Sequence, residues 1–355
     1  MTTPDLLQLT ADLVAIPSVS FDEQQIAAYI ETRLRAAPHL EVTRVGDNLV
    51  ARTNLGHKHR LCIAGHLDTV PVNGNAEARI DGDTLWGLGS TDMKGGIAIA
   101  LLLATTVVEP VVDVTYVFYA REEVAVENNG LRELFAKVPA LLEADVAILG
   151  EPTAAAIEAG CQGTFRVKVT LRGARSHSAR PWMGRNAIHR LGGLLQALDA
   201  YEGRRPLVGG CEYREALQAV FVDGGVAGNV VPDEVCITIN HRFAPDRSPD
   251  QAVAHVRELV DPFLEPGDDF ELADMSAAAY PGLDHPLLQR LIERSDLEVR
   301  AKLGWTDVAF FSEHGIPAVN FGSGEATLAH TAEEHVERWT LDATYAALLN
   351  LLTVA

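Results

Sequence analysis

The stretch RLCIAGHLD (residues 60–68), followed by GGIAIALLLATTVV (95–108) and VTYVFYA (114–120), decides the fold class. Two apolar runs of strand length flank a run of small and apolar residues that is long enough for a helix. Apolar strands that alternate with helices are typical of a mostly parallel sheet with helices on both faces. The sequence therefore predicts an α/β fold for this part of the chain.

The pattern continues outward from this stretch and is interrupted once. Further apolar strands are expected in ADVAILGE (144–151) and IPAVNFG (316–322). Between them, FRVKVTLRG (165–173) and VCITINHRF (235–243) alternate apolar and polar residues, which predicts a sheet with one solvated face. We therefore expect an α/β domain of residues 1–163 and 275–355 and an inserted α+β domain of residues 164–274.

Length, charge and cysteine use limit the class of protein. A chain of 355 residues is long enough for two domains. Its formal net charge of −20 argues against nucleic acid or an anionic membrane as a partner. The four scattered cysteines, the absence of a basic leader and the absence of a long apolar run predict a cytoplasmic protein.

The first candidate motif is GHLDT (65–69), at the end of an apolar strand. Because side chains alternate along a strand, His66 and Asp68 point to the same side. An imidazole that binds a metal needs an acceptor for its second ring nitrogen, and a carboxylate provides one. Taken alone, the pair is equally well explained as a surface histidine beside a turn aspartate.

The second motif is WGLGSTDMKGG (86–96), in which glycines allow the backbone to crowd around Asp92. It lacks the third glycine of a dinucleotide-binding fingerprint. A carboxylate at a tight junction between strand and helix can bridge two cations. The alternative is that Asp92 only caps the helix that follows.

The third motif is the pair Glu122 and Glu123, directly after VTYVFYA (114–120). Adjacent carboxylates at the end of a buried strand repel one another unless a cation or a shared proton is present. Open α/β sheets also bind their ligands at strand ends. One glutamate can then bind a metal while the other accepts a proton from water; two solvated turn residues are the alternative.

Two shorter motifs complete the set. Glu151 lies in GEPT (150–153), and His330 lies in AHT (329–331) after a glycine-rich loop. Each is weak evidence alone, because a single late histidine is more often structural or exposed. Together the motifs supply two histidines and several carboxylates, a mixture of ligands that suits a pair of zinc ions.

The motifs GHLDTVPV, GLGSTDMKGG, REEV, LGEPT and AHTAEEHV, in this order, resemble the two-zinc aminoacylase and carboxypeptidase G family over essentially the full chain. This family includes acetylornithine deacetylase and succinyl-diaminopimelate desuccinylase. The stretches EAGCQGT, GGVAGNVVPD, RFAPDRS and GWTDV are most similar to the actinobacterial desuccinylases. The resemblance implies a zinc-peptidase-like catalytic domain, an inserted lid and dimerisation domain, and a homodimer.

The resemblance also implies the metal ligands. His66 and Glu151 are expected to hold one Zn²⁺, and Glu123 and His330 are expected to hold a second, with Co²⁺ as a possible substitute. Asp92 is expected to bridge the two ions.

Further roles follow from the same resemblance. Asp68 is expected to orient His66, and Glu122 is expected to be the general base. The bond between Asp92 and Met93 is expected to be a cis peptide. His177 is expected to reach the reacting carbonyl in the partner's site across a dimer.

Asn229, Arg242 and Thr306 match family positions that contact the substrate's carboxylates or amide. A guanidinium suits a carboxylate because it offers a forked, permanent charge. The chain departs from proteobacterial relatives just before the inserted domain, where it has Glu158, Cys161 and Gln162 in place of basic residues. Arg175 and Arg180 are therefore candidates for the outer carboxylates of the substrate.

The implied activity is hydrolysis of N-succinyl-LL-2,6-diaminopimelate, a small anionic N-acyl amino acid, by a zinc-activated water. Acetylornithine deacetylation and a carboxypeptidase-like activity are alternatives that share the same zinc ligands. A metal-free binding or scaffold protein is a third alternative. It would be expected to have lost Glu122 or one of the ligands, and all of them are present.

Overall fold

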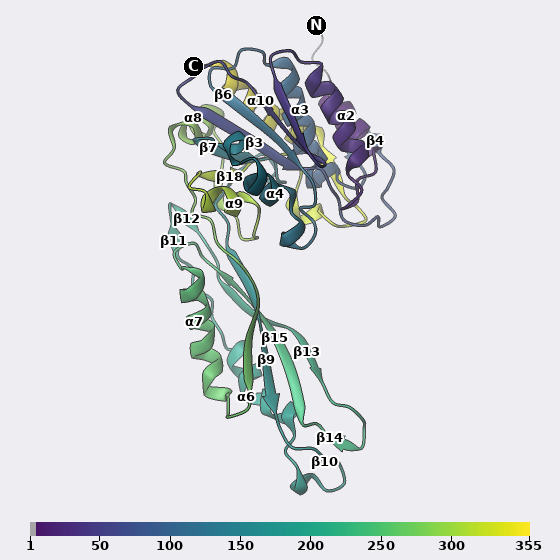
Figure 1. Cartoon of the computed structure of the whole chain (residues 1–355), viewed down its shortest axis with the longest axis vertical. Helices are drawn as coiled ribbons and strands as arrows, with labels where there is room; N and C mark the ends of the chain where they lie inside the picture. The colour runs from purple at the N-terminus through teal and green to yellow at the C-terminus, as the bar shows by residue number, and fades with distance from the viewer. Residues whose placement is uncertain (1–4) are drawn as a thin grey trace. The chain divides into compact units, whose positions relative to one another are not determined.

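The computed structural model describes residues 5–355 and divides them into two compact units (Figure 1). Unit 1 comprises the chain up to Gly160, together with Pro281–Arg300 and Phe310–Ala355. Unit 2 comprises Cys161–Tyr280 and Ala301–Ala309.

Unit 1 is built on an eight-stranded sheet with the order β1-β2-β6-β3-β7-β18-β8-β17. The four central strands β6, β3, β7 and β18 are mutually parallel, whereas β1 and β2 pair antiparallel at one edge. The predicted α/β class with a mostly parallel centre is confirmed. The strands are β1 (Glu41–Val45), β2 (Asn48–Arg52), β3 (Arg60–His66), β6 (Asp113–Tyr119), β7 (Val146–Leu149), β8 (Ile157–Ala159), β17 (Val299–Ala301) and β18 (Ala318–Asn320).

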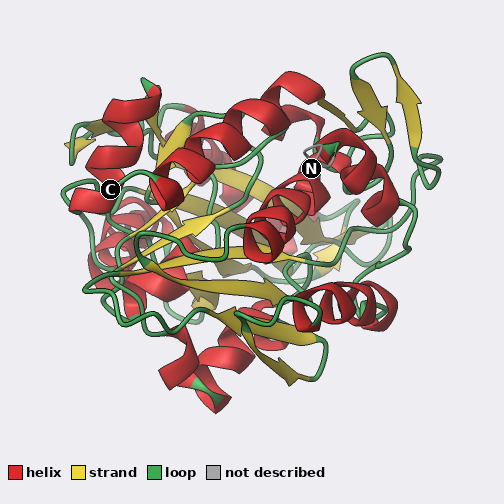
Figure 2. Cartoon of the chain, turned by 90° about the horizontal axis from the view of Figure 1, so that it is seen from above, coloured by secondary structure: helices red, strands yellow, loops and turns green. Residues whose placement is uncertain are grey.

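Helices lie on both sides of this sheet (Figure 2). Helix α3 is buried over most of its surface because it packs on β3 and β6 and is covered by α1, α2 and α10. A helix that is apolar all round is expected in such a position. On the other side, Phe135 of α4 packs edge to face on Phe311 of α9. The helices are α1 (Leu6–Val14), α2 (Gln24–Arg35), α3 (Gly95–Thr106), α4 (Gly130–Lys137), α5 (Pro139–Leu142), α8 (Pro286–Ser295), α9 (Val308–Glu313) and α10 (Arg338–Thr353).

A second, small sheet of unit 1 has the order β19-β5-β4. Its strands are β4 (Arg79–Asp81), β5 (Thr84–Trp86) and β19 (His335–Glu337). Because β5 precedes the Asp92 motif and β19 follows His330, this sheet joins the two segments that carry those residues.

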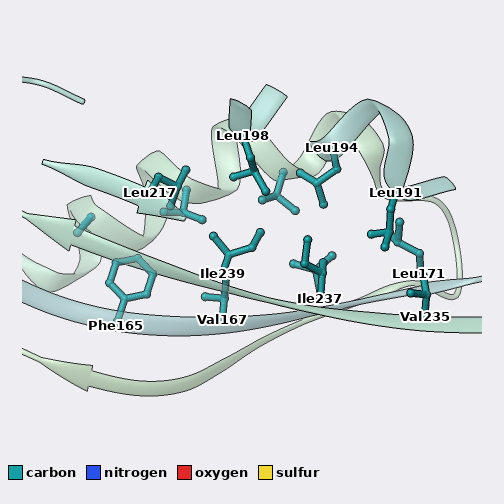
Figure 3. Close-up of a cluster of buried hydrophobic side chains, with 14 of the residues drawn as sticks. Phe165, Val167, Leu171, Leu191, Leu194, Leu198, Leu217, Val235, Ile237 and Ile239 are labelled. Atoms are coloured by element: carbon teal, nitrogen blue, oxygen red, sulfur yellow. The ribbon is translucent and has the colours of Figure 1, made fainter. Parts of the chain in front are cut away.

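Unit 2 contains a four-stranded antiparallel sheet with the order β13-β15-β9-β16. Alternate residues of β9 are buried, as the period-two pattern predicts. They pack against apolar residues of α6 such as Leu191, Leu194 and Leu198 (Figure 3). The elements are β9 (Gly163–Arg172), β10 (Ser176–His177), α6 (Ala187–Asp199), β11 (Leu207–Val208), β12 (Cys211–Glu212), β13 (Ala216–Gly224), β14 (Val230–Val231), β15 (Glu234–Phe243), α7 (Pro249–Val260) and β16 (Asp269–Ser276).

The boundaries of unit 2 differ from the predicted 164–274. Strand β16 stays paired with β9 as far as Ser276, and Ala279 forms a bridge with Cys161, so both ends of the unit extend beyond the prediction. The segment Ala301–Ala309 also belongs to unit 2, and the indole N–H of Trp305 donates to the carbonyl of Ala277 at 3.1 Å. Hydrogen bonds between distant segments, which no local pattern reveals, set these limits.

Two further expectations concern the whole chain. All four cysteines are free. Among residues 5–355, no helix combines the length and apolar character needed to cross a membrane.

His241 makes the stability of unit 2 depend on pH. Its ring is fully buried beside Phe165 and Phe243, and neither ring nitrogen has a hydrogen-bond partner among the described residues. Burial lowers the pKa of His241 to about 4. Below the unfolded pKa of about 6.5 the unfolded state binds the extra proton, so stability falls as the pH drops from about 6.5 to 4.

We expect this titration to remove about 3 kcal/mol of unfolding free energy. The unfolding free energy of His241→Phe, measured with urea across this pH range, should change less with pH than that of the wild type. His189→Gln, an exposed change on α6, is the matched control and should keep the full slope. If the unfolding free energy of His241→Phe changes with pH as steeply as that of the wild type, other groups cause the acid sensitivity.

Candidate metal and catalytic site

The candidate site lies where parallel strands of unit 1 end. His66 is the last residue of β3, which pairs in register with β6 and β7. Glu122 and Glu123 follow β6, and Glu151 follows β7 by two residues. Because Ala64 is level with Leu149, Glu151 lies at the same height as His66. Parallel strands therefore bring these side chains to one edge of the sheet, where such sheets bind ligands.

Asp92 lies between two histidines. One carboxylate oxygen, Oδ1, is 3.1 Å from Nε2 of His66, and the other, Oδ2, is 3.5 Å from Nε2 of His330. Nε2 of His330 is also 2.9 Å from Oε1 of Glu123. The two oxygens of Asp92 thus face histidines from two different segments of the chain, the end of β3 and the turn before β19, which is the arrangement that a bridging carboxylate needs. The peptide bond between Asp92 and Met93 is cis, as predicted.

A glycine allows this close packing. A Cβ atom at Gly96 would lie 2.3 Å from the carbonyl oxygen of Gly150, so only glycine lets the start of α3 approach the end of β7. The Asp92 turn and the Glu151 loop meet at this contact.

Asp68 connects His66 to the glutamate pair. Its Oδ1 lies 3.5 Å from Nδ1 of His66 and accepts the backbone N–H of Glu122 at 2.9 Å. Its Oδ2 accepts the backbone N–H of Glu123 at 3.1 Å and the hydroxyl of Ser20 at 2.7 Å. Asp68 therefore fixes the backbone of both glutamates as well as facing the imidazole.

The charges at the site favour a cation. His66 is 1% exposed and Asp68 is 0% exposed, so ionisable groups are held together away from water. Burial lowers the pKa of His66, but hydrogen bonds to Asp68 and Asp92 outweigh burial and raise it. A hydrogen bond to Asp92 likewise raises the pKa of His330 to about 9. The carboxylates thus create a field that attracts positive charge.

The donor set fits a divalent transition metal. Ligand atoms of His66, Asp92 and Glu123 all lie within 4.8 Å of one another, and nitrogen together with carboxylate oxygen suits zinc and its neighbours. His330 contacts two members of this triplet. Glu151 is buried but outside the triplet, and strand register places it beside His66.

Four residues of unit 2 are predicted to contact the substrate or the reacting carbonyl, and they form two groups: His177 with Asn229, and Arg242 with Thr306. His177 pairs with Val230, and the carbonyl of Asn229 accepts the backbone N–H of Ser178 at 2.9 Å, so His177 and Asn229 are neighbours. Arg242 lies near the far end of β15. Because β15 has 10 residues, about 30 Å separates its two ends.

The second group lies where the chain enters unit 2. The carbonyl of Thr306 accepts the thiol of Cys161 at 3.7 Å, and Cys161 also interacts electrostatically with Arg242. The candidate Arg175 lies in the first group instead, where it donates to Asp233 at 2.8 Å. The predicted substrate residues of one chain therefore do not all converge within unit 2.

Sequence reasoning missed two buried carboxylates that support the site. Oε1 of Glu334 accepts the backbone N–H groups of Thr91 and Asp92, at 3.1 and 3.0 Å. Oε1 of Glu23 accepts the backbone N–H of Arg121 at 3.1 Å, just before the glutamate pair. Glu334 lies in the quoted AHTAEEHV motif, so the motif contained the signal, whereas nothing around Glu23 marks it.

Comparison with known proteins agrees with this geometry. The profile of peptidase family M20/M25/M40 matches residues 62–354, and the chain belongs to this family. The expected family resemblance is confirmed. The solved tripeptidase of Staphylococcus aureus has the same fold, with a TM-score of 0.80 at 21% identity over 100% of this chain and 98% of that one.

Three further proteins are similar to this chain. A succinyl-diaminopimelate desuccinylase of Corynebacterium glutamicum is 44% identical over 93% of this chain and 91% of its own. A Mycobacterium tuberculosis protein to which the same activity is provisionally assigned is 50% identical over 94% and 93%. A dinuclear metal-binding peptidase of Bacillus subtilis, with a TM-score of 0.71 at 18% identity over 98% of this chain and 96% of that one, shares the fold.

Proposed function

We propose that the protein hydrolyses N-succinyl-LL-2,6-diaminopimelate to succinate and LL-2,6-diaminopimelate, a step in diaminopimelate and lysine biosynthesis in the cytoplasm. The observation that carries this proposal is the 44% identity to the Corynebacterium desuccinylase over nearly the whole of both chains. The carboxylate and histidine site at the strand ends of unit 1 supplies the chemistry that such a reaction requires.

Two Zn²⁺ ions are the proposed cofactors, and Co²⁺ is a substitute with similar ligand preferences. His66 and Glu151 would hold one ion, Glu123 and His330 the other, and Asp92 both. Bound zinc would polarise the amide carbonyl and make water acidic enough to lose a proton near neutral pH. Asp68 would keep His66 in the correct orientation.

Glu122 is the proposed general base. Its backbone is fixed by Asp68, while its side chain stays partly exposed, so it can reach both water and substrate. The Glu122 carboxylate would take a proton from the attacking water as the oxygen adds to the amide carbon. It would then deliver that proton to the departing amine nitrogen, which balances the hydrolysis.

Arg242 and Thr306 are proposed to bind the substrate from the end of unit 2 where the chain enters. The Arg242 guanidinium is partly buried on β15, and burial lowers its pKa without removing its charge. A fixed cation is needed because the protein is strongly acidic and the substrate is also anionic.

His177 and Asn229 are proposed to act in the active site of the partner subunit of a homodimer. The length of β15, about 30 Å, lies between them and Arg242, so the two groups of one chain would serve different active sites. In the partner's site, His177 would donate a hydrogen bond to the developing oxyanion.

Mixed dimers provide a direct test of this exchange. His177→Ala and Glu122→Gln should each inactivate their homodimers. A heterodimer should contain one complete site, formed by Glu122 of the His177→Ala chain and the histidine of the other chain. Random mixing should restore about one quarter of the wild-type sites. Turnover that stays at the level of the separate variants after subunit exchange would rule out action across the dimer.

A substrate panel tests the proposed function. Purified zinc-loaded enzyme should be compared by kcat/KM on succinyl-diaminopimelate, acetylornithine, simple acyl amino acids and a tripeptide. We expect succinyl-diaminopimelate to be preferred by about 10–100-fold, since the other substrates leave a charged binding group unpaired. A preference for acetylornithine or the tripeptide would contradict the assignment while leaving the metal chemistry intact.

A further inference from the structure

We propose that His59, Asp145 and His285 form a further metal site, separate from the catalytic residues. This site binds a divalent transition-metal ion such as Zn²⁺. One ligand atom from each of the three side chains lies within 4.8 Å of the others. All three residues belong to unit 1, although His59 and His285 are far apart in sequence.

Strand pairing places the first two residues together. His59 directly precedes β3 and Asp145 directly precedes β7, and these parallel neighbours align Leu61 with Val146. The backbone N–H of Asp145 donates to the carbonyl of Arg60 at 2.9 Å. In return, the N–H of Arg60 donates to Oδ2 of Asp145 at 2.7 Å and fixes the carboxylate.

The third residue comes from a helix terminus. His285 is the N-cap of α8, where its Nδ1 accepts the backbone N–H of Leu287 at 3.3 Å. The centroids of the His285 and His59 rings are 6.0 Å apart. The cap and the edge-to-face ring contact hold this imidazole beside the strand ends.

The positions of the donor atoms suit a shared metal ion better than they suit hydrogen bonds between the side chains. Nδ1 of His59 is buried and has no hydrogen-bond partner among residues 5–355. It lies 3.7 Å from Oδ2 of Asp145, which is too long for a hydrogen bond. Neighbouring donors around a tetrahedral zinc ion are about 3.3 Å apart, so a small side-chain adjustment would let both bind one ion.

The chemistry of the cluster selects the class of ion. Two imidazoles and one carboxylate suit zinc and related transition metals, whereas calcium and magnesium prefer sites made of oxygen. Burial and the neighbouring His59 lower the pKa of His285, against the opposing effect of Asp145. His285 is thereby favoured as the neutral imidazole that a metal requires.

The cluster is separate from the catalytic residues. It lies at the amino-terminal ends of β3 and β7, whereas His66 and Glu151 lie at their carboxyl-terminal ends. His66 follows His59 by seven positions, which span about 23 Å in an extended strand. An ion here would link β3, β7 and α8, and it would stabilise the folded state without taking part in hydrolysis.

Metal counting tests this proposal. Zinc-loaded wild type, His59→Gln and His285→Asn should be dialysed against micromolar free Zn²⁺ and analysed for bound metal. Asparagine keeps a side-chain acceptor for the cap of α8. Each variant should bind one zinc fewer per chain than the wild type, show a smaller rise in Tm on zinc addition, and keep its kcat/KM.

His57→Gln is the matched control, because His57 is an exposed histidine of the same loop and lies outside the cluster. It should retain the additional zinc. Equal zinc content in the wild type and both cluster variants, or an equal loss in the control, would overturn the proposal. The readout is a difference of one ion, so it holds whatever number of ions the catalytic site binds and whatever substrate the enzyme prefers.

Discussion

Replacing Glu122 by glutamine is expected to abolish nearly all turnover while leaving the bound metal unchanged. Glutamine has almost the same size and keeps the backbone N–H that donates to Asp68, but it cannot accept a proton. General acid and base catalysis contributes about 10²–10⁴-fold, and Glu122 is proposed to act in both steps. We therefore expect kcat to fall towards the upper end of that range.

The measurement combines kcat on succinyl-diaminopimelate with elemental analysis of the same sample. Glu127→Gln is the matched control, because Glu127 is an exposed glutamate four residues after Glu123. It should have wild-type activity. Substantial turnover by a fully metallated Glu122→Gln protein would remove the assignment of Glu122 as the base.

Replacing Asp92 by asparagine is expected to remove bound metal and activity together. Asp92 approaches both histidines of the site, through a different oxygen for each. The amide keeps the shape but loses the negative charge and one of the two acceptor oxygens. The loss should exceed the 10–100-fold that typically follows removal of an outer partner of a metal ligand.

Zinc content and kcat should be measured before and after incubation with excess Zn²⁺. Asp81→Asn serves as the control, since the Asp81 side chain is 76% exposed and forms an ion pair with Arg79. It should keep its metal and its activity. Asp92→Asn protein with a wild-type zinc content would mean that Asp92 does not bridge the ions.

Local patterns in the sequence determined much of the fold and the choice of site residues. Apolar runs of strand length, separated by the small-residue helix α3, are sufficient to predict an α/β unit, because burial on both faces requires such composition. Acidic and histidine residues directly after those runs predict a ligand site, since parallel strands share one carboxyl edge. The order of the motifs identified the family.

Tertiary structure decided which of these residues meet and which do not. Asp92 meets His330 because β5, which precedes the Asp92 turn, pairs with β19, which follows His330, and these segments are far apart in the chain. The length of β15 separates His177 from Arg242, although both match one family site. Strand register likewise placed His59 beside Asp145. A sequence encodes each strand locally, but its register depends on distant partners, and register sets these distances.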